Sequence, residues 1–300
     1  MSSAAMTITL RQLEIFEKVA VNQHVTKASE QLYLSQSAVS MAIADMERIT
    51  GAPLFERRGR RLILNDRGRE ILPEVQEVLR RVSGIEQFLS ESVGEPVGVL
   101  KVGASTTIGN YLLPKIVGEF SARHPKAKVL LYVANTQLIE EAVERGEYDL
   151  GLIEGPSHNP SLKASPWIED ELVVISGKKH PFADAGNVTA DMLAGADWII
   201  REKGSGTREI FEAAMAAHGI EYNVSMELGH TEAIKKAVEA GMGVGCLSRM
   251  AVQRELNNWW LMEIGTPLDL RRTLYIVTRE NSYQTRLFRA YTDLLGSISG

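Results

Sequence analysis

The chain has 300 residues, of which 44% are hydrophobic and 24% charged, and its formal net charge is −5. These proportions are ordinary for globular domains, no apolar run approaches a membrane span, and the acidity argues against nucleic-acid binding unless positive charge is concentrated locally. A single cysteine, Cys246, excludes an intrachain disulfide. The first ten residues lack a cationic segment followed by an apolar core, so we expect a cytoplasmic protein without a secretion signal.

The amino-terminal residues predict three short helices. Thr9 and Gln12 have the spacing of a capping box, which predicts a helix through about residue 21. Thr26 is a candidate cap for a second helix, and Ser35 for a third. Steps of four and three mark one apolar stripe on the third helix, formed by Val39, Ile43 and Met46.

Polar residues on the other side of the third helix predict contact with base edges, as in a helix-turn-helix recognition helix. Between Arg48 and Arg69 the chain has seven arginines against two acidic residues, and a short return strand at 62–64 predicts an arginine-rich wing for phosphate contact. The alternative interpretation is a buried three-helix unit whose arginines form a solvated face. The residues predicted to contact DNA are Thr26, Lys27, Ser35, Gln36, Ser37, Ser40, Arg57, Arg58, Arg60 and Arg61.

Ordered motifs favour the DNA-binding interpretation. The segments SQSAVS at 35–40 and GAPLFER at 51–57, with flanking matches at 10–13 and 65–68, resemble the LysR-type transcriptional regulators. The resemblance implies a winged helix-turn-helix that binds double-stranded DNA at an interrupted palindrome. The sequence departs from the common family pattern because Met41, Ala42 and Ala44 occupy places often filled by Arg or Gln. Base reading is therefore expected to depend more on Gln36 and the wing.

One long helix is predicted from Asp66 to about residue 92, with Pro73 expected to kink or restart it. Apolar residues at steps of four and three form a heptad seam, which favours an intermolecular coiled coil over a helix packed on its own domain. The family resemblance agrees, and it implies homodimers that pair into homotetramers. The seam consists of Ile71, Val75, Val78, Val82, Ile85 and Leu89.

From residue 97 onward, strands and helices alternate, which predicts parallel sheets covered by helices. We expect an α+β protein whose second half has two doubly wound α/β lobes, similar to periplasmic solute-binding proteins. The division into lobes is implied by the family resemblance. The predicted parts are a DNA-binding domain at 1–65, a linker helix at 66–93, a hinge at 94–98 and a regulatory domain at 99–300, with lobe one at 99–167 plus 268–300 and lobe two at 168–267.

Hydroxyl-bearing residues follow several predicted strands, where helices begin. Ligands of open α/β sheets bind at this edge, and hydroxyls with free backbone amides there favour an anion. Singly, most such residues are ordinary helix caps; together they predict a cage for a sulfur oxyanion or a short carboxylate. Glu154 would repel an anion, so it either binds a ligand amine or turns away. The candidates are Ser105, Thr106, Thr107, Asn135, Thr136, Glu154, Gly155, Thr207, His230 and Thr231.

The leading hypothesis is a transcription factor controlled by a small anionic effector, with DNA, further copies of the chain and RNA polymerase as partners. The alternative is a solute-binding receptor without a transcriptional role, which the arginine-rich amino-terminal domain opposes. An enzyme is disfavoured because the six histidines lack metal-ligand spacing and no nucleophile elbow or phosphate loop is present. We therefore predict no catalytic residue, metal or cofactor.

Overall fold

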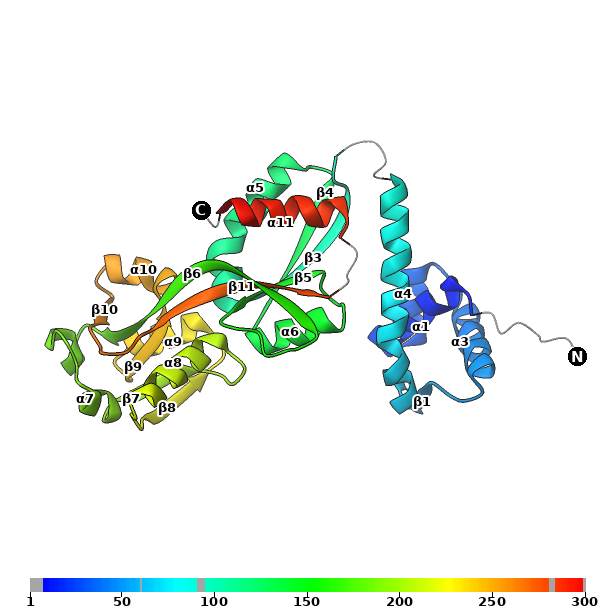
Figure 1. Ribbon diagram of the computed structural model, residues 1–300. Helices are drawn as coiled ribbons and strands as arrows, with labels where there is room; N and C mark the ends of the chain where they lie inside the picture. The colour runs from blue at the N-terminus through cyan, green and yellow to red at the C-terminus, as the bar shows by residue number, and fades with distance from the viewer. Residues whose placement is uncertain (1–7, 60, 91–94, 281–283, 299–300) are drawn as a thin grey trace, which may run out of the picture. The chain divides into compact units, whose positions relative to one another are not determined.

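The computed structural model describes residues 8–59, 61–90, 95–280 and 284–298, with the backbone alone for 87–90. Contacts within the chain divide it into two compact units, Met1–Ser92 and Val93–Gly300 (Figure 1). The combination of an amino-terminal helix-turn-helix and a two-lobed α/β domain confirms the predicted fold class.

The first unit is a winged helix-turn-helix. The capping box at Thr9 is confirmed, and the Ser35 hydroxyl accepts the Ala38 N–H at 3.1 Å as the predicted cap of the third helix. Thr26 is not a cap, because the second helix already begins at Val25. The elements are α1 (Leu10–Asn22), α2 (Val25–Leu32), α3 (Gln36–Thr50), β1 (Phe55–Arg58), β2 (Arg61–Leu64) and α4 (Asp66–Ser90).

The wing is held against α3 and α4 by contacts to the backbone of the segment that leads into it. The carboxylate of Glu47, on α3, accepts the N–H groups of Leu54 at 2.8 Å and Phe55 at 3.3 Å. The Asn65 amide donates to the Pro53 carbonyl, and α4 passes so close that a Cβ on Gly68 would lie 2.2 Å from the Leu54 carbonyl oxygen. The motifs at 51–57 and 65–68 therefore position the wing, and β1 and β2 form an antiparallel hairpin.

The long helix α4 runs through Pro73 without the predicted restart. Its first turns pack on their own unit: Val75 is buried in the helix-turn-helix core and Ile71 packs against that core. These turns therefore pack on their own domain, as the alternative to the coiled coil predicted. The packing offsets the loss of the one backbone hydrogen bond that proline removes. Val78 and Ile85 are exposed at 40% and 59%, so the free part of the seam begins at Val78. The side chain of Leu89 lies outside the described residues.

Replacing Val78 and Val82 together with Asp should dissociate a dimer held by this seam, because two carboxylates would face their counterparts in an apolar strip. Sedimentation velocity of the full chain would measure the change, with circular dichroism to verify the fold. A double variant that sediments as the wild type would contradict the seam. Val75→Asp is the matched control, since it should unfold the DNA-binding unit by burying an unpaired charge.

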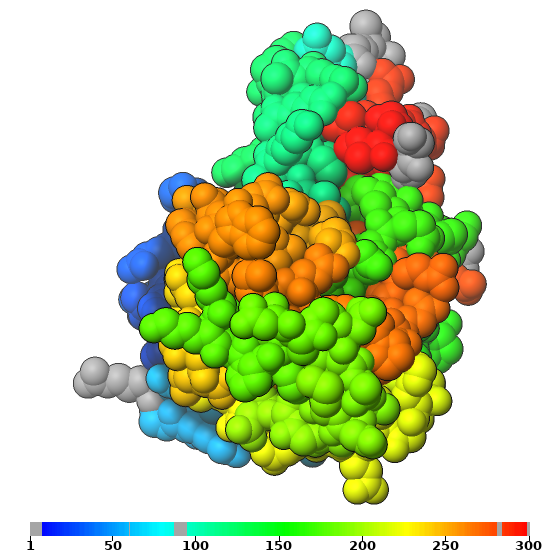
Figure 2. Space-filling view, turned by 90° about the vertical axis from the view of Figure 1, so that its left-hand side faces the viewer, coloured from blue at the N-terminus to red at the C-terminus, as the bar shows by residue number. Residues whose placement is uncertain are grey.

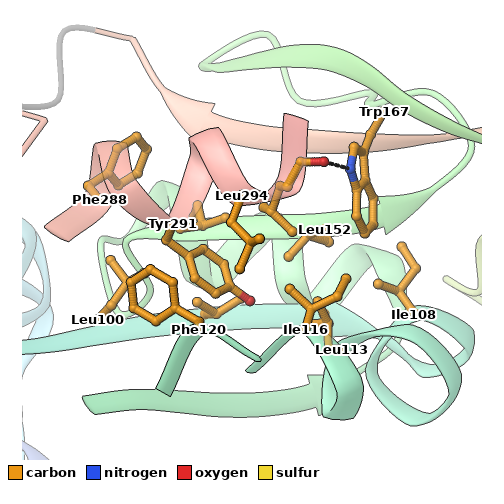
Figure 3. Close-up of a cluster of buried hydrophobic side chains, with 14 of the residues drawn as sticks. Leu100, Ile108, Leu113, Ile116, Phe120, Leu152, Trp167, Phe288, Tyr291 and Leu294 are labelled. Atoms are coloured by element: carbon orange, nitrogen blue, oxygen red, sulfur yellow. Dashed lines mark hydrogen bonds between the residues drawn. The ribbon is translucent and has the colours of Figure 1, made fainter. Parts of the chain in front are cut away.

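In the first lobe of the second unit, the carboxyl-terminal helix closes a core of large side chains. Tyr291 packs edge-on against Phe120, and the Trp167 indole donates to the Leu295 carbonyl at 2.8 Å (Figure 3). The strands of this lobe are β3 (Gly98–Ser105), β4 (Ala127–Ala134) and β5 (Leu150–Glu154), and its helices are η1 (Ile108–Leu112, a π-helical turn), α5 (Leu113–Arg123), α6 (Thr136–Glu144) and α11 (Arg286–Ile298).

The second lobe packs its strands around a separate core that includes Trp198 and Phe211. Figure 2 faces the outer end of this lobe, where α10 (orange) forms part of the surface. Its strands are β7 (Asp197–Arg201), β8 (Asn223–Leu228), β9 (Val244–Ser248) and β10 (Leu261–Ile264), and its helices are η2 (Pro181–Asp184), α7 (Ala190–Ala194), α8 (Gly206–Ala217), α9 (Thr231–Glu239) and α10 (Arg249–Asn257).

Two long strands, β6 (Leu162–Gly177) and β11 (Arg271–Arg279), join the lobes into one sheet of order β4-β3-β5-β11-β6-β9-β7-β8 (Figure 1). Both run antiparallel to their neighbours, whereas β3 pairs in parallel with β4 and β5, and β7 with β8 and β9, as the predicted parallel sheets require. Leu268 and Leu270 pack in the core of the second lobe, and the return to lobe one therefore falls near Arg271 instead of residue 268.

Candidate functional site

The two lobes meet where strands end and helices begin. Several contacts join a residue at or near such a junction of one lobe to one of the other, along the edge of the sheet where ligands of open α/β folds bind. The contacts run from Arg201 Nη2 to Thr106 Oγ1 (3.2 Å), from Gln137 N–H to the Gly204 carbonyl (3.1 Å), from Thr207 Oγ1 to Glu154 Oε2 (2.7 Å) and from Tyr111 Oη to Glu232 Oε1 (2.6 Å).

A buried ion-pair cluster lies at the centre of this interface. Arg272 on β11 donates to Glu154 at 2.9 Å and to Asp170 at 2.7 Å, and all three side chains are at least nine-tenths buried. Glu154 also accepts the Thr107 N–H at 2.8 Å. Burial alone would raise the pKa of Glu154, but Arg272 and the Thr207 hydroxyl outweigh it and hold the pKa at about 2. We name Glu154, Asp170, Thr207 and Arg272 the lobe-junction cluster.

The lobe-junction cluster changes the roles of two predicted ligand residues. The Glu154 carboxylate is neutralised by Arg272, so the structure gives it a partner within the protein. The Thr207 hydroxyl donates to Glu154 and accepts from Arg272 at 3.0 Å, so it is committed to the same cluster. A Cβ on Gly206 would lie only 1.9 Å from the Glu154 carbonyl oxygen, and glycine is therefore required for α8 to approach β5 this closely.

Glu154→Gln should destabilise the second unit by roughly 3 kcal/mol at pH 7, because the carboxylate is ionised in the fold with its pKa lowered from 4.5 to about 2. A lowered pKa stabilises the fold above pH 4.5, and this stabilisation is lost as the pH falls towards 2. The difference between variant and wild type should therefore shrink over that range.

Urea denaturation followed by tryptophan fluorescence measures this effect in the full chain, since all four tryptophans (Trp167, Trp198, Trp259 and Trp260) lie in the second unit. Glu239→Gln, at an exposed ion pair with Lys236, is the matched control and should change stability by less than about 1 kcal/mol. A pH-independent difference for Glu154→Gln would contradict an ionised Glu154.

Four hydroxyls around the interface are buried and have no hydrogen-bond partner within the described residues. They are at most 5% exposed, and each lies next in sequence to a residue that contacts the opposite lobe. A buried hydroxyl without a partner costs free energy, which a ligand oxygen at this place would recover. The four residues are Ser105, Thr136, Ser205 and Thr231.

A buried arginine accompanies these hydroxyls. Arg201 is 2% exposed and donates to Glu202 at 2.8 Å and to Thr106 at 3.2 Å, while its Nη1 has no partner in the described part of the chain. Neither Arg201 nor Ser205 is among the residues predicted from the sequence. The available signal was an arginine directly after the apolar run Trp198 to Ile200, at the carboxyl end of a strand.

The ten sequence-predicted ligand residues thus separate into groups. Ser105, Thr136 and Thr231 keep free hydroxyls, whereas Thr106 is paired with Arg201. His230 is exposed and makes no capping bond. Three further residues have backbone or capping roles: the Thr107 N–H donates to Glu154, Asn135 caps α6 through the Leu138 N–H, and Gly155, at φ +81°, donates to the Thr273 carbonyl.

A cavity of about 420 Å³ reaches the interface between α6 and α8. Two of the unpartnered hydroxyls, on Thr136 and Ser205, line it. Its wall also carries two cations and three carboxylates, on Lys203, Arg208, Glu140, Glu209 and Glu212. Its volume falls within the usual range of small-ligand sites. Because two helix amino termini also meet here, the local backbone favours negative charge.

A second connection between the lobes lies on the side of α9. Lys235 is only 4% exposed, and its ammonium group lies 3.0 Å from Glu255 and 3.4 Å from the Tyr111 hydroxyl. Tyr111, on the π-helical turn, donates in turn to Glu232. The start of α9, where Thr231 carries its free hydroxyl, is thereby held against the first lobe.

In the first unit, the residues predicted to contact DNA lie on exposed surfaces. Gln36, Ser37 and Ser40 are exposed on α3, and Thr26 and Lys27 are exposed on α2. Ser35 is committed to capping α3, and its hydroxyl lies 2.9 Å from that of Ser37. Arg57 and Arg58 lie on β1 and Arg61 on β2, so these three arginines lie on the strands of the wing. Arg60 is outside the described residues.

Two kinds of feature are absent from the described ranges. No group of three or more His, Cys, Asp or Glu there could hold a metal ion, and no described helix is both long and apolar enough to span a membrane. Cys246 is buried, and burial raises the pKa of its thiol to about 12. A helix-turn-helix with an exposed polar face, joined to a two-lobed domain whose interface holds buried unpartnered hydroxyls, is the architecture of a ligand-responsive DNA-binding regulator.

Comparisons with known sequences agree. Residues 10–69 match the model of bacterial regulatory helix-turn-helix proteins of the lysR family, and residues 94–298 match that of the LysR substrate binding domain. The chain is 41% identical over 289 residues to the HTH-type transcriptional regulator YeiE of Escherichia coli (strain K12), covering 96% of this chain and 97% of that one. It is 32% identical to the RuBisCO operon transcriptional regulator of Allochromatium vinosum, over 91% of each. This chain therefore belongs to the LysR family of transcriptional regulators.

Solved structures show the same fold. The regulatory domain of Synechocystis CcmR, solved in complex with 2-PG, is 30% identical with a TM-score of 0.63, covering 67% of this chain and 97% of that one. A full-length OxyR variant from Pseudomonas aeruginosa is 22% identical with a TM-score of 0.77, covering 97% of this chain and 94% of that one.

Proposed function

We propose that the regulatory domain binds a small anion between its lobes, at the four unpartnered hydroxyls and Arg201, and that binding alters how the protein engages an interrupted palindromic operator. The observation that carries the proposal is the set of buried hydroxyls left without partners at the lobe interface. A buried guanidinium with one free nitrogen adds the positive charge that hydroxyls lack.

The effector classes that fit are a sulfur oxyanion and a short carboxylate, because both present several acceptor oxygens to hydroxyl and guanidinium donors. Each oxygen accepted by a hydroxyl or a guanidinium replaces a missing hydrogen bond. The CcmR regulatory domain was solved in complex with 2-PG, which supports a small ligand in this domain by analogy. A receptor without a transcriptional role is disfavoured because the amino-terminal unit matches a DNA-binding family.

A panel of sulfur oxyanions and short carboxylates, each titrated during thermal melting of the full chain, tests the anion site. A ligand that binds only the native state raises the melting temperature by mass action. We expect a selective rise for at least one member, and we expect Ser205→Ala combined with Thr136→Val to abolish it while leaving DNA affinity unchanged.

Ser176→Ala is the matched control for that experiment. Ser176 is fully buried in the second lobe on β6, but its hydroxyl already donates to the Gly177 carbonyl at 3.3 Å. This variant should melt at a slightly lower temperature and keep the full ligand-induced rise. A Thr136/Ser205 double variant that responds like the wild type would place the effector elsewhere.

In the proposed DNA complex, the wing arginines supply sequence-independent affinity and α3 discriminates bases. Dimers would form through the exposed part of the α4 seam, and the two DNA-binding units of a dimer match the two half-sites of a palindrome. These dimers would pair into tetramers. Effector binding would then change the arrangement of subunits and their contact with RNA polymerase.

Replacing Arg57, Arg58, Arg60 and Arg61 with Ala should weaken binding to every duplex and lower the salt dependence of affinity. The slope of log K against log [salt] should fall by about 0.9 for each phosphate that the variant no longer neutralises. Fluorescence anisotropy from 50 to 300 mM salt, on the order of the physiological range, would measure it. The matched control removes the exposed arginines Arg123 and Arg289 of the regulatory unit and should leave the slope unchanged; an unchanged slope in the wing variant would disprove the phosphate role.

A further inference from the structure

The outward ridge of the recognition helix has an unusual composition. Val39, Ile43 and Met46 are buried on one side of α3, and the opposite side carries exposed residues at steps of four, three and four. Since 3.6 residues make one turn, these residues stand in one row and project directly away from the core. The ridge consists of Ser37, Met41, Ala44 and Arg48.

The middle of this ridge is apolar. Met41 is 64% exposed and Ala44 is exposed beside it, one turn further along. The only cation on the ridge is Arg48, near the carboxyl end of α3, and its guanidinium is paired with Asp45 at 2.9 Å. The recognition helix of a helix-turn-helix contacts bases mainly through its amino-terminal turns, so Met41 lies where bases are read and Arg48 lies beyond them.

The chemistry of the ridge limits the bases that it can read. Bidentate recognition of guanine requires Arg or Lys, and neither stands on the ridge before Arg48. Met41 and Ala44 have no side-chain donor for a base edge. In the major groove, the one apolar feature that distinguishes a base pair is the C5-methyl group of thymine. An unbranched, polarisable thioether adapts well to such a contact.

We propose that Met41 is a specificity-determining residue that packs, with Ala44 beside it, against the C5-methyl group of a thymine in each operator half-site. Ser37 and Ser40 flank this contact and are placed to hydrogen-bond neighbouring base edges. The proposal rests on the proposed reading of an operator by α3, concerns the DNA-binding unit alone and does not depend on the effector site.

Deoxyuridine tests the contact directly, because it pairs like thymidine and lacks only the methyl group. A duplex is selected from a random pool with the full-length protein, and each thymine is replaced in turn by deoxyuridine. Anisotropy then gives Kd for the wild type, Met41→Ala and Met41→Leu. We expect one replacement per half-site to weaken wild-type binding about fourfold, the effect of one buried methyl group. Met41→Ala should lose this sensitivity, and Met41→Leu should keep it.

Because Met41 is exposed, Met41→Ala should melt like the wild type, and its neutral side chain should leave the salt slope unchanged. If this variant binds too weakly, Met41→Gln keeps the length, adds polarity and should show the same loss of sensitivity. The proposal fails if no thymine of the selected duplex is sensitive to methyl removal. It also fails if the sensitivity persists undiminished in both Met41→Ala and Met41→Gln.

Discussion

The second unit depends on one buried guanidinium. Arg272 projects from β11, one of the two strands shared by both lobes, and it neutralises Glu154 at the end of β5 and Asp170 on β6. Removing one partner of such a group would leave an uncompensated buried charge, which costs several kcal/mol. The cluster also orients the start of α8, because Glu154 binds the Thr207 hydroxyl and only a glycine at 206 permits the approach. The candidate ligand residues on both lobes therefore lie at fixed positions.

The lobe interface contains polar groups with hydrogen-bond partners and polar groups without them, and the two sets have different roles. The lobe-junction cluster has its charges paired within the protein, so it holds the lobes together with or without a ligand. Ser105, Thr136, Ser205 and Thr231 are buried at the same interface without partners in the described part of the chain. Native proteins rarely retain several unpaired hydroxyls close to one interface, since each costs free energy. The asymmetry marks where a ligand would add stability.

Local pattern predicted much of the fold and only part of the site. Capping residues such as Thr9 and Ser35 determine helix starts through neighbouring backbone, so they can be read from a few residues. The prediction that Thr26 caps the second helix was wrong, because that helix already begins at Val25. The roles of Glu154 and Thr207 could not be read in this way, because they depend on Arg272, which lies 118 and 65 residues away in sequence and meets them only after β11 returns to lobe one. Val75 shows the same limit: a heptad pattern cannot tell which apolar core a residue enters.

The fixed junction also constrains how an effector can act. Opening the lobes widely would separate Arg272 from its carboxylates, and the expected penalty of several kcal/mol is a large share of the roughly 8 kcal/mol that a micromolar ligand supplies. Small rearrangements at the periphery avoid this penalty. The start of α9 is suited to them, because it carries the free hydroxyl of Thr231 beside Glu232, which holds Tyr111 of the other lobe through one hydrogen bond. A ligand oxygen on Thr231 would therefore act on the periphery of the interface while the charged centre stays closed.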